Sequence, residues 1–208
     1  MSPKADSRLR GLGWGALGGF LGAGLGHMAV MGLHRWAGDA NLWLKGAHGP
    51  PFFDLALATG IFYACVGAAL YPGAARRLFG AGVGLGAVLL ALALPMALAT
   101  RLFAWGEAEG PETYAWFYLV LGLYGAANAA SAWLLGLFAG GWRRALAAVL
   151  GMTAAGLAHL AARMLVPELA DRVEVIGVLP PPSALGTGMI WGGGLGFGMR
   201  FFETGEAS

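Results

Sequence analysis

The chain has 208 residues, of which 58% are hydrophobic and only 12% are charged, and its net charge is +2. Soluble domains carry about 25% charged residues, so this composition excludes an ordinary water-soluble domain. The basic residues are spread along the chain rather than gathered into a groove, and we therefore expect no nucleic-acid partner. The single cysteine, Cys65, excludes an intrachain disulfide and any site that needs several thiolates.

Long apolar stretches follow one another along the chain, and each has roughly the 17 to 25 residues that a helix needs to cross a bilayer. The sequence therefore predicts an all-α fold, a bundle of six transmembrane helices forming a single integral membrane domain over residues 1–208, with the lipid bilayer as its surroundings. Residues 1–10 are a short N-terminal segment and residues 203–208 a C-terminal tail. The predicted spans are Gly11–His34, Phe52–Tyr71, Phe79–Phe103, Tyr114–Ala139, Ala145–Val166 and Ala184–Phe202.

Basic residues are concentrated at every second junction between these spans, where the connections are short. Because Lys and Arg in short loops remain on the cytoplasmic side, this pattern predicts that both termini are cytoplasmic, in a bacterial-type inner (plasma) membrane. The residues that this orientation places inside are Lys4, Arg8, Arg10, Arg76, Arg77, Arg143, Arg144 and Arg200. The spans also form three successive hairpins, which indicates either a triplicated unit or the ordinary requirements of topology.

Many of the 37 glycines recur every fourth residue inside the predicted spans. This spacing puts them on one stripe of a helix and lets two backbones approach closely. We expect the first and sixth spans to pack tightly through these glycines, as a glycine zipper, and in one arrangement they pack against each other. The alternative is that the glycines line a narrow conduit. The residues expected to pack are Gly15, Gly18, Gly22, Gly26, Gly188, Gly192 and Gly196.

Two histidines, His27 and His159, fall at similar depth in spans that run in the same direction. Polar groups inside a membrane are costly and point to function. Three interpretations remain open: the pair could be the axial ligands of a b-type haem, could handle a proton or a metal ion, or could only hydrogen-bond neighbouring helices.

The fourth span carries Tyr124, Asn128 and Ser131 on one helical face. Such a stripe either bonds to another helix or lines a polar cavity. Asp54, near the outer end of the second span, is a further candidate, with helix capping as its simpler role.

No catalytic motif is present, neither G-x-S-x-G nor H-E-x-x-H nor a P-loop, so we expect no enzyme, no catalytic residue and no metal site. The leading hypothesis is translocation of a small solute, ion or proton along an intramembrane polar path. A second hypothesis is a non-catalytic scaffold or accessory subunit that binds copies of itself or other membrane subunits. A third is a redox subunit that holds haem b through His27 and His159. The residues of the predicted polar path are His27, Asp54, Tyr124, Asn128, Ser131 and His159.

Overall fold

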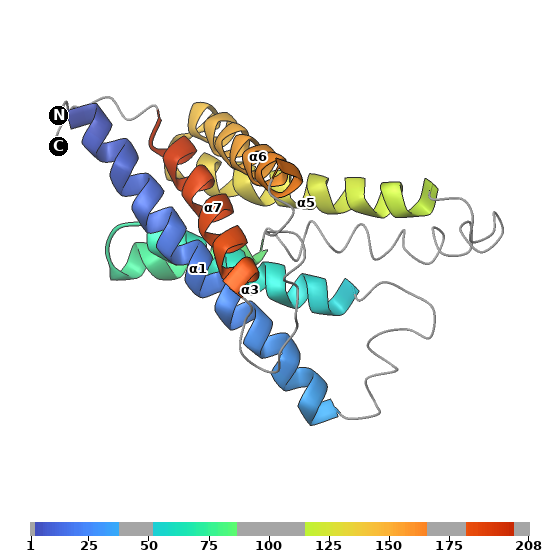
Figure 1. Cartoon of the computed structure of the whole chain (residues 1–208). Helices are drawn as coiled ribbons and strands as arrows, with labels where there is room; N and C mark the ends of the chain where they lie inside the picture. Colours follow the sequence, from blue (N-terminus) through green and yellow to red (C-terminus); the bar gives the residue numbers. More distant parts are fainter. Residues whose placement is uncertain (1–2, 38–51, 87–114, 166–181, 202–208) are drawn as a thin grey trace.

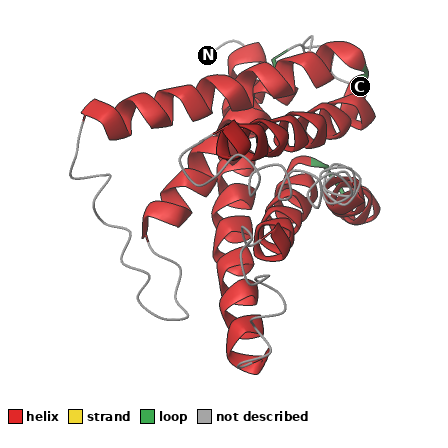
Figure 2. Cartoon of the chain, turned by 90° about the vertical axis from the view of Figure 1, so that its right-hand side faces the viewer, coloured by secondary structure: helices red, strands yellow, loops and turns green. Residues whose placement is uncertain are grey.

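The computed structural model describes residues 3–37, 52–86, 115–165 and 182–201. These ranges are helical and contain no strand (Figure 2), which confirms the predicted all-α class. The predicted spans Phe79–Phe103 and Tyr114–Ala139 lie partly outside these ranges, and so does the predicted tail 203–208. The helices are α1 (Pro3–Ala37), α3 (Phe52–Leu70), a helix over residues 74–86, α5 (Ala115–Gly140), α6 (Trp142–Leu165) and α7 (Pro182–Met199).

Two of the described helices are long and apolar enough to cross a membrane. They cover Ala5–Leu33 in α1 and Trp142–Ala162 in α6, while Leu57–Leu70 in α3 is a shorter apolar stretch. By length and composition, these helices indicate association with a membrane.

The first helix begins at Pro3, earlier than the predicted span, which starts at Gly11. Proline suits the first turn of a helix. Asp6 lies in that turn and pairs with Arg10, one turn further on, and both features stabilise helical structure outside an apolar environment. At ~1.5 Å per residue, its 35 residues make α1 about 52 Å long, longer than the ~30 Å hydrocarbon core.

Two glycines with positive φ make the sharp turns of the chain. Gly73, with φ of 82°, lies between α3 and the helix over residues 74–86. Gly141, with φ of 89°, is the only residue between α5 and α6. Its N–H donates to the carbonyl of Leu137 at 2.8 Å, which closes the last turn of α5. Glycine adopts this backbone conformation without the steric penalty of a Cβ, so each turn reverses the chain over a very short distance.

The helix α7 lies between α1 and α6 (Figure 1). The helix α3 also packs against α1, and α5 packs along α6. The buried core joins α3, α5, α6 and α7 through Tyr63, Val66, Leu70, Tyr71, Ala132, Leu135, Ala148, Met152, Leu195 and Met199. Two of the predicted hairpins, formed by α1 with α3 and by α6 with α7, are therefore packed pairs in the structure.

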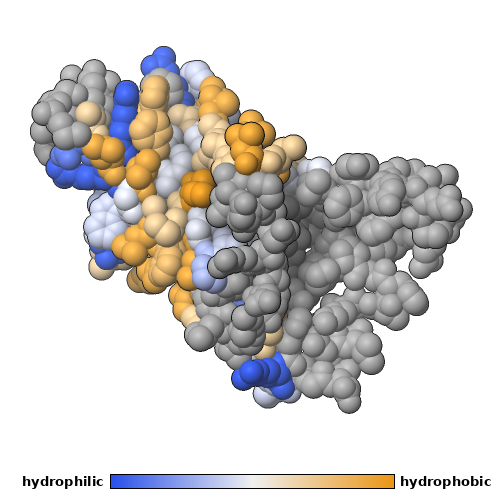
Figure 3. Space-filling view, viewed as in Figure 1, coloured by the Kyte–Doolittle hydropathy of each residue, from blue (hydrophilic) through white to orange (hydrophobic). Residues whose placement is uncertain are grey.

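Outside this core, and most clearly along α1, the distribution of large and small residues is the reverse of that in a water-soluble bundle. Along α1 the buried positions in the Gly11–Gly26 stretch are all glycines. Leu17 and Leu21 are 45% and 47% exposed, and Leu157 on α6 is 62% exposed. Figure 3 shows hydrophobic residues over much of the described surface in view, with hydrophilic ones near the end that carries both termini and at the lower end of the molecule. Small residues inside and large apolar residues outside are typical of helices that pack in lipid.

Candidate functional site

Glycines bring the backbones of α1 and α7 into direct contact. A Cβ added at Gly15 would overlap the carbonyl oxygen of Gly192, and one added at Gly19 would overlap that of Gly188. The contact continues to Gly196, where a Cβ would lie 3.0 Å from the carbonyl carbon of Gly11. The predicted stripe of α7 thus packs against α1, and no side chain separates the two helices at these points.

A second glycine series of α1, formed by Gly18, Gly22 and Gly26, meets a different helix. A Cβ at Gly22 would lie 2.7 Å from the Cα of Phe62 on α3, and one at Gly26 would lie 2.9 Å from the carbonyl oxygen of Ala58. Gly18 lies equally close to Ala69. The two interleaved series on α1 therefore serve two neighbours, α7 and α3.

A separate set of glycines joins α7 to α6. A Cβ at Gly194 would lie 2.6 Å from the carbonyl oxygen of Gly151, and one at Gly198 would lie 2.7 Å from the carbonyl carbon of Ala147. Together with the α1 contact, this packs α7 against a helix on each of two faces. The glycine faces of α1 and α7, against which a helix of another protein would pack, already contact helices of this chain.

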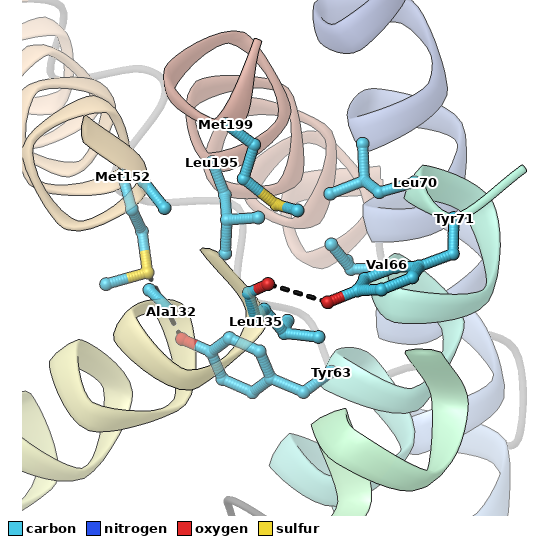
Figure 4. Packing of buried hydrophobic residues seen from close by; sticks show 10 residues of the cluster. Tyr63, Val66, Leu70, Tyr71, Ala132, Leu135, Met152, Leu195 and Met199 are labelled. Carbon is cyan, nitrogen blue, oxygen red and sulfur yellow. Dashed lines mark hydrogen bonds between the residues drawn. The ribbon is translucent and has the colours of Figure 1, made fainter. Parts of the chain in front are cut away.

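Tyr63 has the largest fully buried side chain among the described residues, and it forms the centre of a polar cluster near the middle of α3 (Figure 4). Its hydroxyl lies 3.0 Å from Oδ1 of Asn128, 3.1 Å from the backbone carbonyl of Asn128 and 3.1 Å from Sδ of Met152. All three atoms are acceptors, and the hydroxyl has one proton to donate. Tyr63 therefore links α3 to α5 and α6 through one shared proton.

Sequence reasoning selected Asn128 and Ser131 but missed Tyr63, because a single tyrosine in an apolar helix has no spacing pattern. In the structure Asn128 is 4% and Ser131 1% exposed. The hydroxyl of Ser131 donates to the carbonyl of Ala127 at 2.9 Å, within its own helix. These two residues of the predicted path are thus hydrogen-bonded inside the bundle. Tyr124 and Asp54 lie on α5 and α3, and their side chains fall outside the described residues.

The predicted histidine pair lies on helices that contact different faces of α7. His27 is on α1, which meets the Gly188–Gly192 face, whereas His159 is on α6, which meets the face carrying Gly194. His159 Nε2 lies 3.1 Å from the hydroxyl of Thr187 on α7. In this arrangement α7 separates the helices that carry the two imidazoles, and Thr187, which sequence reasoning missed, is the partner of His159.

Two buried nitrogen atoms in the described part of the chain have no hydrogen-bond partner there. They are Nε2 of His27 and Nε1 of Trp191. The indole of Trp191 lies beside Gly156 on α6, one turn along α7 from Thr187. Buried polar atoms are nearly always hydrogen-bonded, so these two are exceptions that require an explanation.

One end of the bundle is basic. Arg8 donates to the carbonyl of Phe201 at 3.2 Å, and its guanidinium carbon lies 4.2 Å from the centre of the Phe201 ring. Arg200 donates to the carbonyl of Leu70 at 3.3 Å, and the Arg77 guanidinium carbon lies 6.0 Å from the centre of the Trp14 ring. The start of α1, the end of α3 and the end of α7 therefore meet at this end.

Among the described residues, no three His, Cys, Asp or Glu side chains lie close enough together to hold a metal ion. The chain matches no known protein family, no curated protein and no solved structure. The site must therefore be interpreted from its own chemistry.

Proposed function

We propose that this protein is a six-span membrane protein of a bacterial-type inner membrane, with both termini in the cytoplasm, that moves a small solute, an ion or a proton across the bilayer. Lipid as the surrounding medium is supported by the outward-facing leucines of α1 and α6 and by the glycines between the helices. The orientation is supported by the arginines at one end of the bundle, since basic residues favour the cytoplasmic side.

The observation that carries translocation is the pair of buried, unpaired nitrogens on α1 and α7, at His27 and Trp191. A polar group that is buried in a bilayer without a hydrogen-bond partner costs several kcal/mol of free energy. His27 on α1 and Trp191 on α7 bear this cost within apolar stretches of closely packed helices. A polar species that passes between the helices would form hydrogen bonds with these nitrogens in transit. Asn128 and Ser131, whose hydrogen bonds lie within the bundle, hold the helices together in this proposal.

Reconstitution tests this proposal. The purified full chain is placed in liposomes, and the fluxes of protons, K⁺, Na⁺ and small neutral solutes are measured with trapped dyes and by vesicle swelling. We expect flux of one of these species, reduced at least tenfold by His27→Ala. The matched control is Met28→Ala, at the adjacent exposed position on α1, which should retain the flux.

Failure to move any of these species, in protein that is folded and inserted, would refute translocation. Co-purification of another membrane protein with such an inactive preparation would instead support the scaffold hypothesis. A visible haem spectrum would support the redox hypothesis.

A further inference from the structure

The contact between His159 and Thr187 determines which ring nitrogen of the histidine carries a hydrogen. The Thr187 hydroxyl lies 2.8 Å from the carbonyl oxygen of Ser183, one turn earlier in α7, and 3.1 Å from His159 Nε2. A hydroxyl has one proton but two acceptor lone pairs. Because the carbonyl oxygen of Ser183 can only accept a hydrogen bond, the Thr187 hydroxyl donates its one proton to that oxygen. The contact with His159 then requires that Nε2 carries the hydrogen and donates it to Thr187.

This assignment leaves Nδ1 as the basic nitrogen of a neutral imidazole. Protonation at Nδ1 gives an imidazolium that still donates from Nε2 to Thr187, so the ring need not rotate when it gains or loses a proton.

The described helices that pack around His159 carry few other titratable groups. No residue of α7 is titratable over its whole length, Pro182–Met199. On α5 the only titratable residues are Tyr118 and Tyr124, whose side chains fall outside the described residues. On α6 itself, Arg163 is one turn away and its side chain is likewise not described, while Arg143 and Arg144 are at the opposite end.

The position of His159 along α6 is also informative. It lies within the apolar stretch Trp142–Ala162, about 9 Å from the end of α6 at Leu165 at ~1.5 Å per residue. The unpaired indole nitrogen of Trp191 is in the same contact between α6 and α7. An ionisable side chain at this depth, in a helix contact that also holds an unsatisfied donor, indicates a proton relay more readily than a structural link.

Resting on the translocation proposed above, we infer that the transported species is the proton, and that His159 carries it at Nδ1 while Thr187 positions the ring through Nε2. The step is balanced. A proton from water on one side binds the Nδ1 lone pair and forms imidazolium. The same proton then leaves Nδ1 for water on the other side, and the Nε2 hydrogen stays in place throughout.

Proton flux in liposomes, driven by a potassium diffusion potential and followed with a trapped pH dye, tests the role of His159. His159→Gln keeps an amide donor for Thr187 but has no basic nitrogen, and we expect proton flux to fall at least tenfold in protein that remains folded. Proton flux unchanged in this variant would overturn the inference. Flux of another species that is insensitive to His159→Gln would overturn it too, while leaving translocation intact. The absence of any flux in the parent protein would refute translocation itself.

Nitrogen-15 NMR of histidine-labelled protein tests the positioning role without any flux. His159→Gln assigns the resonances, and at high pH we expect a protonated Nε2 and an unprotonated Nδ1. Thr187→Val should lose this tautomer preference and shift the pH profile of flux, whereas Thr187→Ser should restore both. Thr153→Val, at an exposed threonine of α6, is the control and should change neither. A hydrogen found on Nδ1 of His159 rather than on Nε2 in the parent protein at high pH would overturn the inference.

Discussion

Substitution of Gly15 by alanine tests the backbone contact between α1 and α7 most sharply. The added Cβ would lie 2.9 Å from the carbonyl carbon of Gly192 and 3.1 Å from the Cα of Gly196. Carbon atoms in favourable contact are ~3.5–4.0 Å apart, so the helices must separate by roughly half to one ångström. Overpacking of this kind costs about 1–3 kcal/mol.

A second effect of the same substitution acts in the opposite direction. Alanine is a better helix former than glycine by about 0.8–1.0 kcal/mol. Gly13→Ala is the matched control, because it lies in the same helix and its Cβ would meet nothing within 4 Å. Subtraction of the two variants cancels the helix-propensity gain and leaves the overlap alone. We therefore expect Gly15→Ala to be less stable than Gly13→Ala by about 1–3 kcal/mol, or roughly 5- to 140-fold in the unfolding equilibrium at 1.4 kcal/mol per tenfold.

Reversible unfolding in mixed detergent and SDS micelles, followed by far-UV circular dichroism, measures the free energy of unfolding of both variants. Equal values for the two would show that α1 and α7 do not meet at Gly15, and the reasoning would fail. Gly192→Ala and Gly186→Ala form a second such pair on α7, since only the first would meet the other helix.

Three further predictions concern the core, the turns and the outer surface. Tyr63→Phe removes the hydroxyl proton that links α3 to Asn128 and Met152, and should lower the free energy of unfolding by about 0.5–1.5 kcal/mol in the same assay; an unchanged value would contradict the described cluster. Gly141→Ala places a side chain at φ of 89° and should cost about 1–2 kcal/mol, seen as a lower melting temperature, whereas an unchanged one would argue against this turn. Leu157→Asp puts a charge on the exposed face of α6; if lipid covers that face, its insertion should become less favourable by about 2.5–3.5 kcal/mol, and undiminished recovery in the membrane fraction would contradict this.

Local sequence patterns predict which residues share a helical face, because that depends only on helical periodicity. The four-residue spacing correctly puts Gly15 on one stripe with Gly19, and Gly18 on another with Gly22. It does not reveal that the first stripe meets α7 and the second meets α3, since the choice of neighbour depends on how all the helices pack. Similarly, the apolar pattern begins only at Gly11 and does not reveal that α1 begins at Pro3, because polar residues can continue a helix outside lipid.

The polar contacts were harder to predict than the helices. His27 and His159 match in depth, but depth does not specify which helix lies between theirs, and in the structure that helix is α7. The partner of His159 is Thr187, a residue that bonds equally well to its own helix and therefore has no distinctive pattern. Tyr63 is likewise an isolated polar side chain in an apolar stretch.

The central claim is that lipid, and not water, surrounds the outward-facing leucines. Spin labels at Leu17→Cys and Leu157→Cys, each in a Cys65→Ser background and in proteoliposomes, report this medium through their collisions with dissolved oxygen and with a water-soluble nickel complex. Oxygen concentrates in lipid and the nickel complex stays in water. If lipid surrounds both sites, the labels collide frequently with oxygen and rarely with the nickel complex. Frequent collisions with nickel at these two positions would show that water surrounds the helices, and would contradict the account.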